Sequence, residues 1–74
     1  MLSVKYACET AEYTNNPKDL SALAKHEDEI VRYQVAKNPN TSDADIQELA
    51  KDENKDVREM AKKELARRRK QEEV

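Results

Sequence analysis

The chain has 74 residues, which is room for one small domain with a thin hydrophobic core. Charged residues make up 41% of it and glycine is absent, which excludes the glycine-rich turns of phosphate- and dinucleotide-binding folds and favours helices over β-hairpins. The formal net charge is -2, but residues 1–54 carry six Lys/Arg against eleven Asp/Glu, whereas residues 55–74 carry eight against five.

Amphipathic patterning predicts five helices in chain order, over residues 2–13, 17–25, 29–37, 42–51 and 55–71. Asn16 before Pro17 is typical of an N-cap followed by a first helical position, and Ser42 or the residue before it is a candidate cap for the fourth helix. Asn38 followed by Pro39 ends the third helix, because a proline disfavours helical backbone in the residue before it. The residues expected to face the core are Leu2, Tyr6, Ala7, Cys8, Ala11, Leu20, Leu23, Ala24, Ile30, Val31, Gln34, Val35, Ile46, Leu49, Ala50, Val57, Met60, Ala61 and Leu65.

Several classes of protein are disfavoured by what the sequence lacks. No apolar run approaches the roughly 18 residues of a membrane span, and no secretory signal pattern opens the chain, so we expect a cytoplasmic protein. Cys8 is the only cysteine and His26 the only histidine, a set too small for a disulfide or a thiolate zinc site. His26 lies in a polar turn and no nucleophile has a base beside it, so we expect no enzymatic activity, no cofactor and no metal.

An internal duplication is the most informative feature of the sequence. Residues 19–25 (Asp-Leu-Ser-Ala-Leu-Ala-Lys) match residues 45–51 (Asp-Ile-Gln-Glu-Leu-Ala-Lys), and Val31-Arg32 matches Val57-Arg58, each at an offset of 26 residues. A fixed period between about 20 and 50 residues indicates stacked supersecondary units that bury their apolar faces against one another. Two units are fewer than such stacks usually need, so we expect the first helix to cover the open face of the first unit.

The pattern also resembles a known family, the leucine-rich repeat variant proteins, whose helical repeats are similar to HEAT repeats. The matching residues are Leu20, Leu23, Ala24, Val31, Arg32, Val35, Ala36, Asn38, Pro39, Asn40 and Thr41 in the first unit and Ile46, Leu49, Ala50, Asp52, Val57 and Arg58 in the second. His26 departs from the pattern, which has an aspartate where the second unit has Asp52. The resemblance implies a right-handed superhelix in which an α-helix alternates with a shorter helix that is partly 3₁₀, and it implies no enzymatic activity.

The predicted fold class is therefore all-α, a short right-handed helical-repeat solenoid in a single domain. Its parts are a capping helix (1–15), two helical-hairpin repeats (16–41 and 42–66) and the charged tail of the last helix (67–74).

The leading functional hypothesis is a non-catalytic module or scaffold that binds another protein, because repeat stacks present an extended surface. The candidate contact residues are Tyr33, Arg32, Lys37, Arg58 and Glu59, which share one register of the second helix of each unit. Two alternatives stay open for them. Arg32 and Arg58 can instead bond helix-end carbonyls or an acidic residue of the neighbouring unit, such as Asp52 or Asp28. Tyr33 can instead be a large amphipathic residue that fills the core.

The second hypothesis is nucleic-acid binding to the phosphate backbone through a basic cluster of the last helix, made of Lys62, Lys63, Arg67, Arg68, Arg69 and Lys70. Against it, the chain is acidic overall and Glu64 can pair with Arg68 one turn later, which is typical of a solvated helix face. A third hypothesis is that an uncovered face of the short stack pairs with a second copy of the chain. We therefore expect either a monomer or a weak homodimer. We expect no contact with a membrane.

Overall fold

A computed structural model describes residues 4–72, and within that range the chain is all-helical, with no strand. The elements are α1 (Val4–Tyr13), α2 (Pro17–Leu23), α3 (Glu29–Lys37), α4 (Asp43–Leu49) and α5 (Lys55–Glu72). The prediction of an all-α chain is confirmed, and each helix lies where the apolar periodicity placed it. Leu2, which we expected on the apolar face of the first helix, lies outside the described residues.

Short polar side chains cap the helices as the sequence indicates. The Oδ1 atom of Asn16 accepts a hydrogen bond from the N–H of Lys18 at 2.9 Å, and Pro17 occupies the first turn of α2. Ser42 Oγ accepts from the N–H of Asp45 at 3.2 Å at the start of α4. These bonds satisfy backbone donors that have no partner inside the helix, and so they fix where each helix begins.

The expected 3₁₀ character is confined to the ends of the short helices. Both α2 and α4 are seven-residue α-helices. In the turn after each of these helices, two successive N–H groups bond from residue i to i−3: Lys25 to Ala22 and His26 to Leu23, then Lys51 to Glu48 and Asp52 to Leu49. The partly 3₁₀ helices implied by the family resemblance are therefore corrected to α-helices with tightened ends.

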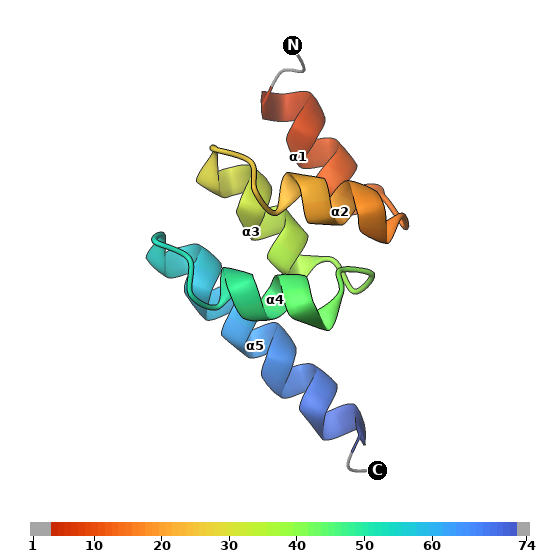
Figure 1. Cartoon of the computed structure of the whole chain (residues 1–74), viewed down its shortest axis with the longest axis vertical. Coiled ribbons are helices and arrows are strands. Elements are labelled where there is room, and N and C mark those ends of the chain that lie inside the picture. The colour runs from red at the N-terminus through yellow and green to blue at the C-terminus, as the bar shows by residue number, and fades with distance from the viewer. Residues whose placement is uncertain (1–3, 73–74) are drawn as a thin grey trace.

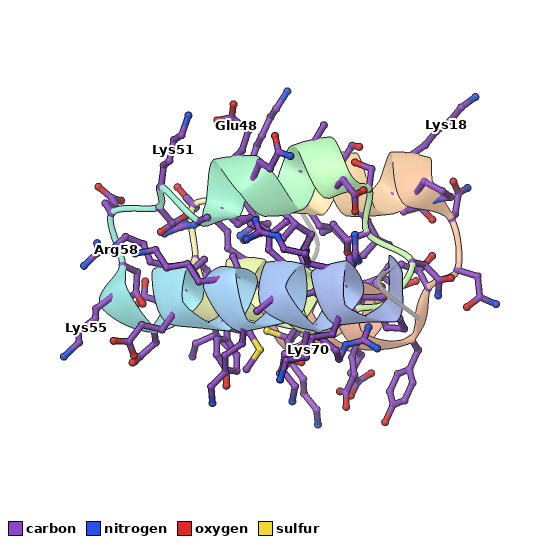
Figure 2. All side chains as sticks on the ribbon, turned by 90° about the horizontal axis from the view of Figure 1, so that it is seen from below. Lys18, Glu48, Lys51, Lys55, Arg58 and Lys70 are labelled. Carbon is purple, nitrogen blue, oxygen red and sulfur yellow. The ribbon has the colours of Figure 1, made fainter. Side chains whose placement is uncertain are left out.

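The five helices form two layers. Helices α1, α3 and α5 lie side by side in one layer, and α2 and α4 cross them on the same side (Figures 1 and 2). Helix α3 packs against both α1 and α5, while α4 packs against α5 and α3. The molecule is elongated, 43 × 25 × 15 Å along its principal axes.

One hydrophobic cluster lies between the layers. Its buried members are Ala7, Ala11, Leu20, Val31, Val35, Ala36, Ile46, Leu49, Val57 and Ala61. Residues 26 positions apart take equivalent places in it, as Leu20 and Ile46 or Val31 and Val57 do, all of them fully buried. Leu23 packs against the same cluster, so the apolar residues of the two duplicated segments share one environment.

Two of the residues expected in the core are on the surface. Tyr6 and Ile30 are each 55% exposed. Successive residues of a helix point about 100° apart, and the core is taken by the neighbours Ala7 and Val31, so Tyr6 and Ile30 are turned out of it. Cys8 is half-buried against the cluster, and burial, together with the negative charge of nearby carboxylates, raises the pKa of its thiol.

Candidate functional site

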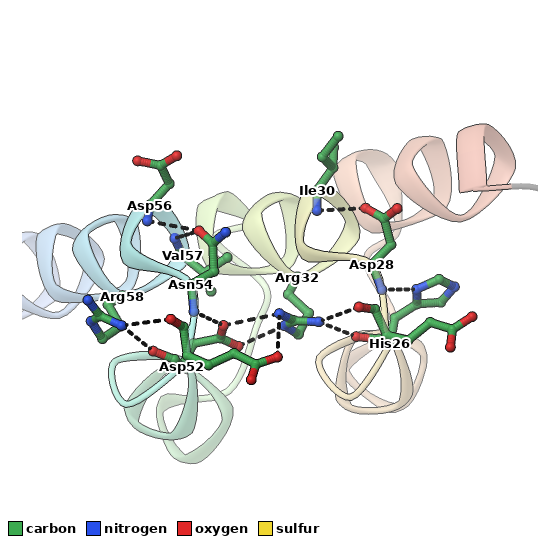
Figure 3. Close-up of polar contacts among 11 residues, drawn as sticks. His26, Asp28, Ile30, Arg32, Asp52, Asn54, Asp56, Val57 and Arg58 are labelled. Carbon is green, nitrogen blue, oxygen red and sulfur yellow. Dashed lines mark hydrogen bonds and ion pairs between the residues drawn. The ribbon is translucent and has the colours of Figure 1, made fainter.

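The turns before α3 and α5 are held by the two duplicated arginines. Arg32 donates from Nη1 to the carbonyls of His26 at 2.7 Å and Glu27 at 2.9 Å. Arg58 donates from Nη1 to the carbonyls of Asp52 and Glu53, both at 2.9 Å (Figure 3). Each guanidinium thus satisfies two carbonyls in the turn between a short helix and a long one, which supports the structural interpretation of these arginines.

The hydrogen bonds within the two turns also correspond at an offset of 26 residues. The N–H of Asp28 donates to Nδ1 of His26 at 3.0 Å, and the N–H of Asn54 donates to Oδ1 of Asp52 at 2.9 Å. Asp28 and Asn54 then cap α3 and α5 (Figure 3). An imidazole nitrogen replaces the carboxylate as acceptor, so the departure of His26 from the family pattern leaves the geometry of the turn unchanged.

Arg32 also connects the two turns. Its Nε and Nη2 atoms donate to the carboxylate of Asp52 at 2.7 and 3.2 Å, and the residue is only 8% exposed. Burial of Asp52 disfavours its charged form, but hydrogen bonds from Arg32 and from the N–H of Asn54 outweigh this and hold the pKa of the carboxyl below its ordinary value. The structure therefore places Arg32 inside the fold and away from the exposed contact surface predicted for it.

The basic cluster of the last helix is partly neutralised within the chain. Glu64 is buried and receives hydrogen bonds from Arg67 at 3.0 and 2.6 Å and from Arg68 at 2.9 Å. The bonds from Arg67 and then those from Arg68 hold the pKa of Glu64 below its ordinary value against the opposing effect of burial. Arg68 also pairs with Asp43 of α4 at 2.6 Å.

The pair between Glu64 and Arg68 expected from the sequence is present, and the contact of Arg68 with Asp43 holds α5 to α4. Within the described residues, Arg67 bonds only to Glu64 of its own helix and stays exposed. The other exposed members of the cluster, which make no ion pair among the described side chains, are Lys62, Lys63, Arg69 and Lys70.

A groove of about 390 Å³ opens between α3 and α5. Its lining residues are Glu29, Ile30, Tyr33, Asn54, Asp56, Glu59, Met60 and Lys63. Ile30 is more than half exposed here, while Tyr33 and Met60 are half-buried and pack against the core. The groove therefore combines an apolar floor with a rim that carries three carboxylates and one ammonium group.

Two of the five predicted contact residues line this groove, namely Tyr33 and Glu59. Lys37 lies beside it, with its Nζ atom 5.7 Å from the centre of the Tyr33 ring, a cation–π distance. The side chains of Arg32 and Arg58 bond to the turns before α3 and α5 instead. The structure therefore does not bring the five predicted contact residues together.

Met60 packs against the core as expected, but its position in the groove was not predicted. Ile30 was not predicted to be a surface residue, although the sequence held a signal for it. The residue 26 positions after Ile30 is Asp56, which is exposed. Ile30 and Asp56 are both exposed, and the same comparison with Glu59 led to Tyr33 as a candidate contact residue.

A second hollow, of about 440 Å³, lies between α2 and α4, and its lining combines small apolar residues with carboxylates and one lysine. Two of its carboxylates already have partners: Asp45 accepts from Ser21 and Ser42, and Asp52 accepts from Arg32. Figure 2 shows Glu48 and Lys51 pointing from α4 and the turn after it into solvent. Its apolar lining consists of two alanines and the buried Leu49, so it exposes no large apolar side chain as the first groove does with Ile30.

The part of the chain that the structure describes holds no group of three or more His, Cys, Asp or Glu residues placed to bind a metal ion. None of the helices in residues 4–72 is long and apolar enough to cross a membrane.

Comparison with protein-family models, with curated proteins and with solved structures found no match to this chain. The similarity to leucine-rich repeat variant proteins therefore depends on the sequence pattern alone.

Proposed function

We propose that the chain is a short right-handed helical-repeat solenoid of the leucine-rich repeat variant type, with α1 as the capping helix. The support is the 26-residue correspondence, which extends from residue types to hydrogen bonds in the turns at His26 and Asp52. It extends also to the carbonyl contacts of Arg32 and Arg58. Two turns with the same bonds are what stacking of one supersecondary unit on another would produce.

The function that we propose is non-catalytic binding of another protein, with the groove between α3 and α5 as the binding site. One observation carries this proposal: Ile30 is 55% exposed above the half-buried Tyr33 and Met60, in a groove on the helix layer. A large aliphatic residue beside a tyrosine in a concave surface is typical of the centre of a protein interface.

Selection from a phage-displayed library of random dodecapeptides tests this function. Clones selected on the immobilised chain are compared for binding to the wild type and to Ile30→Ser. We expect most of the clones to lose about tenfold in affinity for Ile30→Ser, since a central apolar contact contributes about 1.4 kcal/mol or more. Ile30 is exposed, so its replacement should leave the fold intact, which circular dichroism verifies.

Tyr13→Ser is the matched control, because Tyr13 is 74% exposed at the end of α1 and does not line the groove. Clones that bind both variants as well as they bind the wild type, or a selection that yields no binder, would contradict the proposed function.

Nucleic-acid binding through the C-terminal helix has weaker support. Arg67 and Arg68 have Glu64 and Asp43 as ionic partners, and each such pair reduces the positive charge available to phosphates. The exposed cations that remain for this alternative are Lys62, Lys63, Arg69 and Lys70. Binding of a labelled duplex that weakens steeply with salt and disappears when these four are replaced by glutamine would favour it over protein binding.

A further inference from the structure

The lining of the groove between α3 and α5 is negative overall, because it holds three carboxylates and one ammonium group. The rim carboxylates Glu29, Asp56 and Glu59 take part in no ion pair among the residues whose side chains the structure describes. By contrast, Asp52 and Glu64, whose side chains are largely buried, each pair with an arginine.

Interaction with the helix dipoles explains why two of the three rim carboxylates are there, but not the third. Glu29 and Asp56 are in the first turns of α3 and α5, where a negative charge interacts favourably with the helix dipole. Glu59 lies one turn further along α5, beyond the reach of that effect, and it faces the same groove. The single cation of the lining, Lys63, lies one further turn along α5, so the carboxylates dominate the end where the helices begin.

The apolar floor lies next to this negative rim. Ile30 and Tyr33 of α3 and Met60 of α5 form a surface that is wide enough for one or two large side chains, in a hollow of about 390 Å³. An occupant must therefore bring apolar atoms to cover Ile30 and positive charge to meet the rim.

We propose that the occupant is a segment of another protein in which one or two large apolar residues are flanked by arginine or lysine. The apolar residues cover Ile30, Tyr33 and Met60, and the basic residues pair with Glu29, Asp56 and Glu59. This inference rests on the proposed function, because it names the chemistry of the partner that uses the same groove. Charge complementarity of this kind raises the rate of association and selects against acidic segments.

The experiment begins with the peptide clones that lose binding to Ile30→Ser. We expect these clones to be enriched in arginine and lysine next to leucine, isoleucine, phenylalanine or tryptophan. The most enriched sequence is synthesised with a fluorescent label, and its Kd is measured by fluorescence anisotropy. The Kd should rise about fivefold for Glu29→Gln/Glu59→Gln, since each partly exposed charge pair makes a modest contribution. It should also rise when the salt concentration increases from about 0.05 to about 0.5 M.

Glu9→Gln/Glu12→Gln is the matched control, because it removes the same charge from exposed positions of α1 outside the groove. It should leave the Kd unchanged. Groove-dependent peptides that lack basic residues, or a Kd that responds equally to both double substitutions, would overturn this inference while leaving the proposed function in place. A selection without any groove-dependent peptide would overturn both.

Discussion

Arg32 and Arg58 occupy equivalent positions, but their contacts differ, so we expect them to contribute differently to the stability of the fold. Both satisfy two carbonyls of the preceding turn. Arg32 alone also makes a two-point contact with a carboxylate, that of Asp52, in a largely buried setting. A planar guanidinium can donate hydrogen bonds to carbonyls and to a carboxylate at the same time. The ammonium group of a lysine cannot reproduce this arrangement of donors.

This difference predicts unequal effects of the same substitution. Arg32→Lys should lower the free energy of unfolding by about 2–3 kcal/mol, because carbonyl oxygens and the Asp52 carboxylate lose buried donors. Arg58→Lys, at a more exposed position, should cost less than about 1 kcal/mol. Urea denaturation followed by circular dichroism measures both values. Equal losses for the two variants would contradict the role assigned to Arg32.

The paired carboxylates predict how stability depends on pH. The pKa of Asp52 is held below its ordinary value of 3.8, and that of Glu64 below 4.5. A lowered pKa in the folded state means that the unfolded chain binds protons first as the pH falls, so protonation favours unfolding. The stability that these groups contribute is complete above about pH 5 and is lost as the pH falls through their folded pKa values.

Urea denaturation at pH values from about 6 down to about 2.5 tests this dependence. Asp52→Asn should be less stable than the wild type at pH 6 and should lose less of its remaining stability on acidification. If the two stability curves fall in parallel, Asp52 does not contribute to the acid sensitivity.

At the scale of elements, the sequence predicted the helices and their order because the period of apolar residues and the caps are local signals. The start of α2 at Asn16 and Pro17 needed nothing beyond neighbouring residues. The outward direction of Tyr6 and Ile30 was not predicted, because it depends on which face of α1 and α3 the other helices cover. That information is tertiary, and only the comparison between duplicated units gave a hint of it.

Asn38 shows a second kind of feature that local patterns do not reveal. The sequence identified it as the residue that ends α3, and the structure confirms this. Its side chain also donates from Nδ2 to the carbonyls of Ala11 at 2.9 Å and Thr14 at 3.0 Å, at the end of α1. The residue is buried, so one amide joins the end of α1 to the loop between α3 and α4. The candidate site was likewise only half predictable: Tyr33 and Glu59 were identified, but the groove arises from packing of α3 beside α5.

At the scale of the whole molecule, the end helix α1 is tied to the rest by both packing and hydrogen bonds. Ala7 and Ala11 are fully buried against the common core, and Asn38 binds the last carbonyls of α1. In the two-unit stack that we propose, neither unit has much stability of its own, so the loss of one interface should affect all helices together. We therefore expect the chain to unfold as one cooperative unit that includes α1.

Ala11→Glu tests that cooperativity. A glutamate at this fully buried position adds volume and an unpaired charge between α1 and the core, so we expect the entire chain to lose its helical signal. If α1 were a separable cap, the circular dichroism at 222 nm would fall by only about a fifth, which is the share of α1 among the helical residues. Tyr13→Glu is the control, since Tyr13 is exposed on the same helix and its replacement should leave the spectrum unchanged. A partial loss for Ala11→Glu, with a remaining cooperative transition on heating, would show that α2–α5 fold without α1.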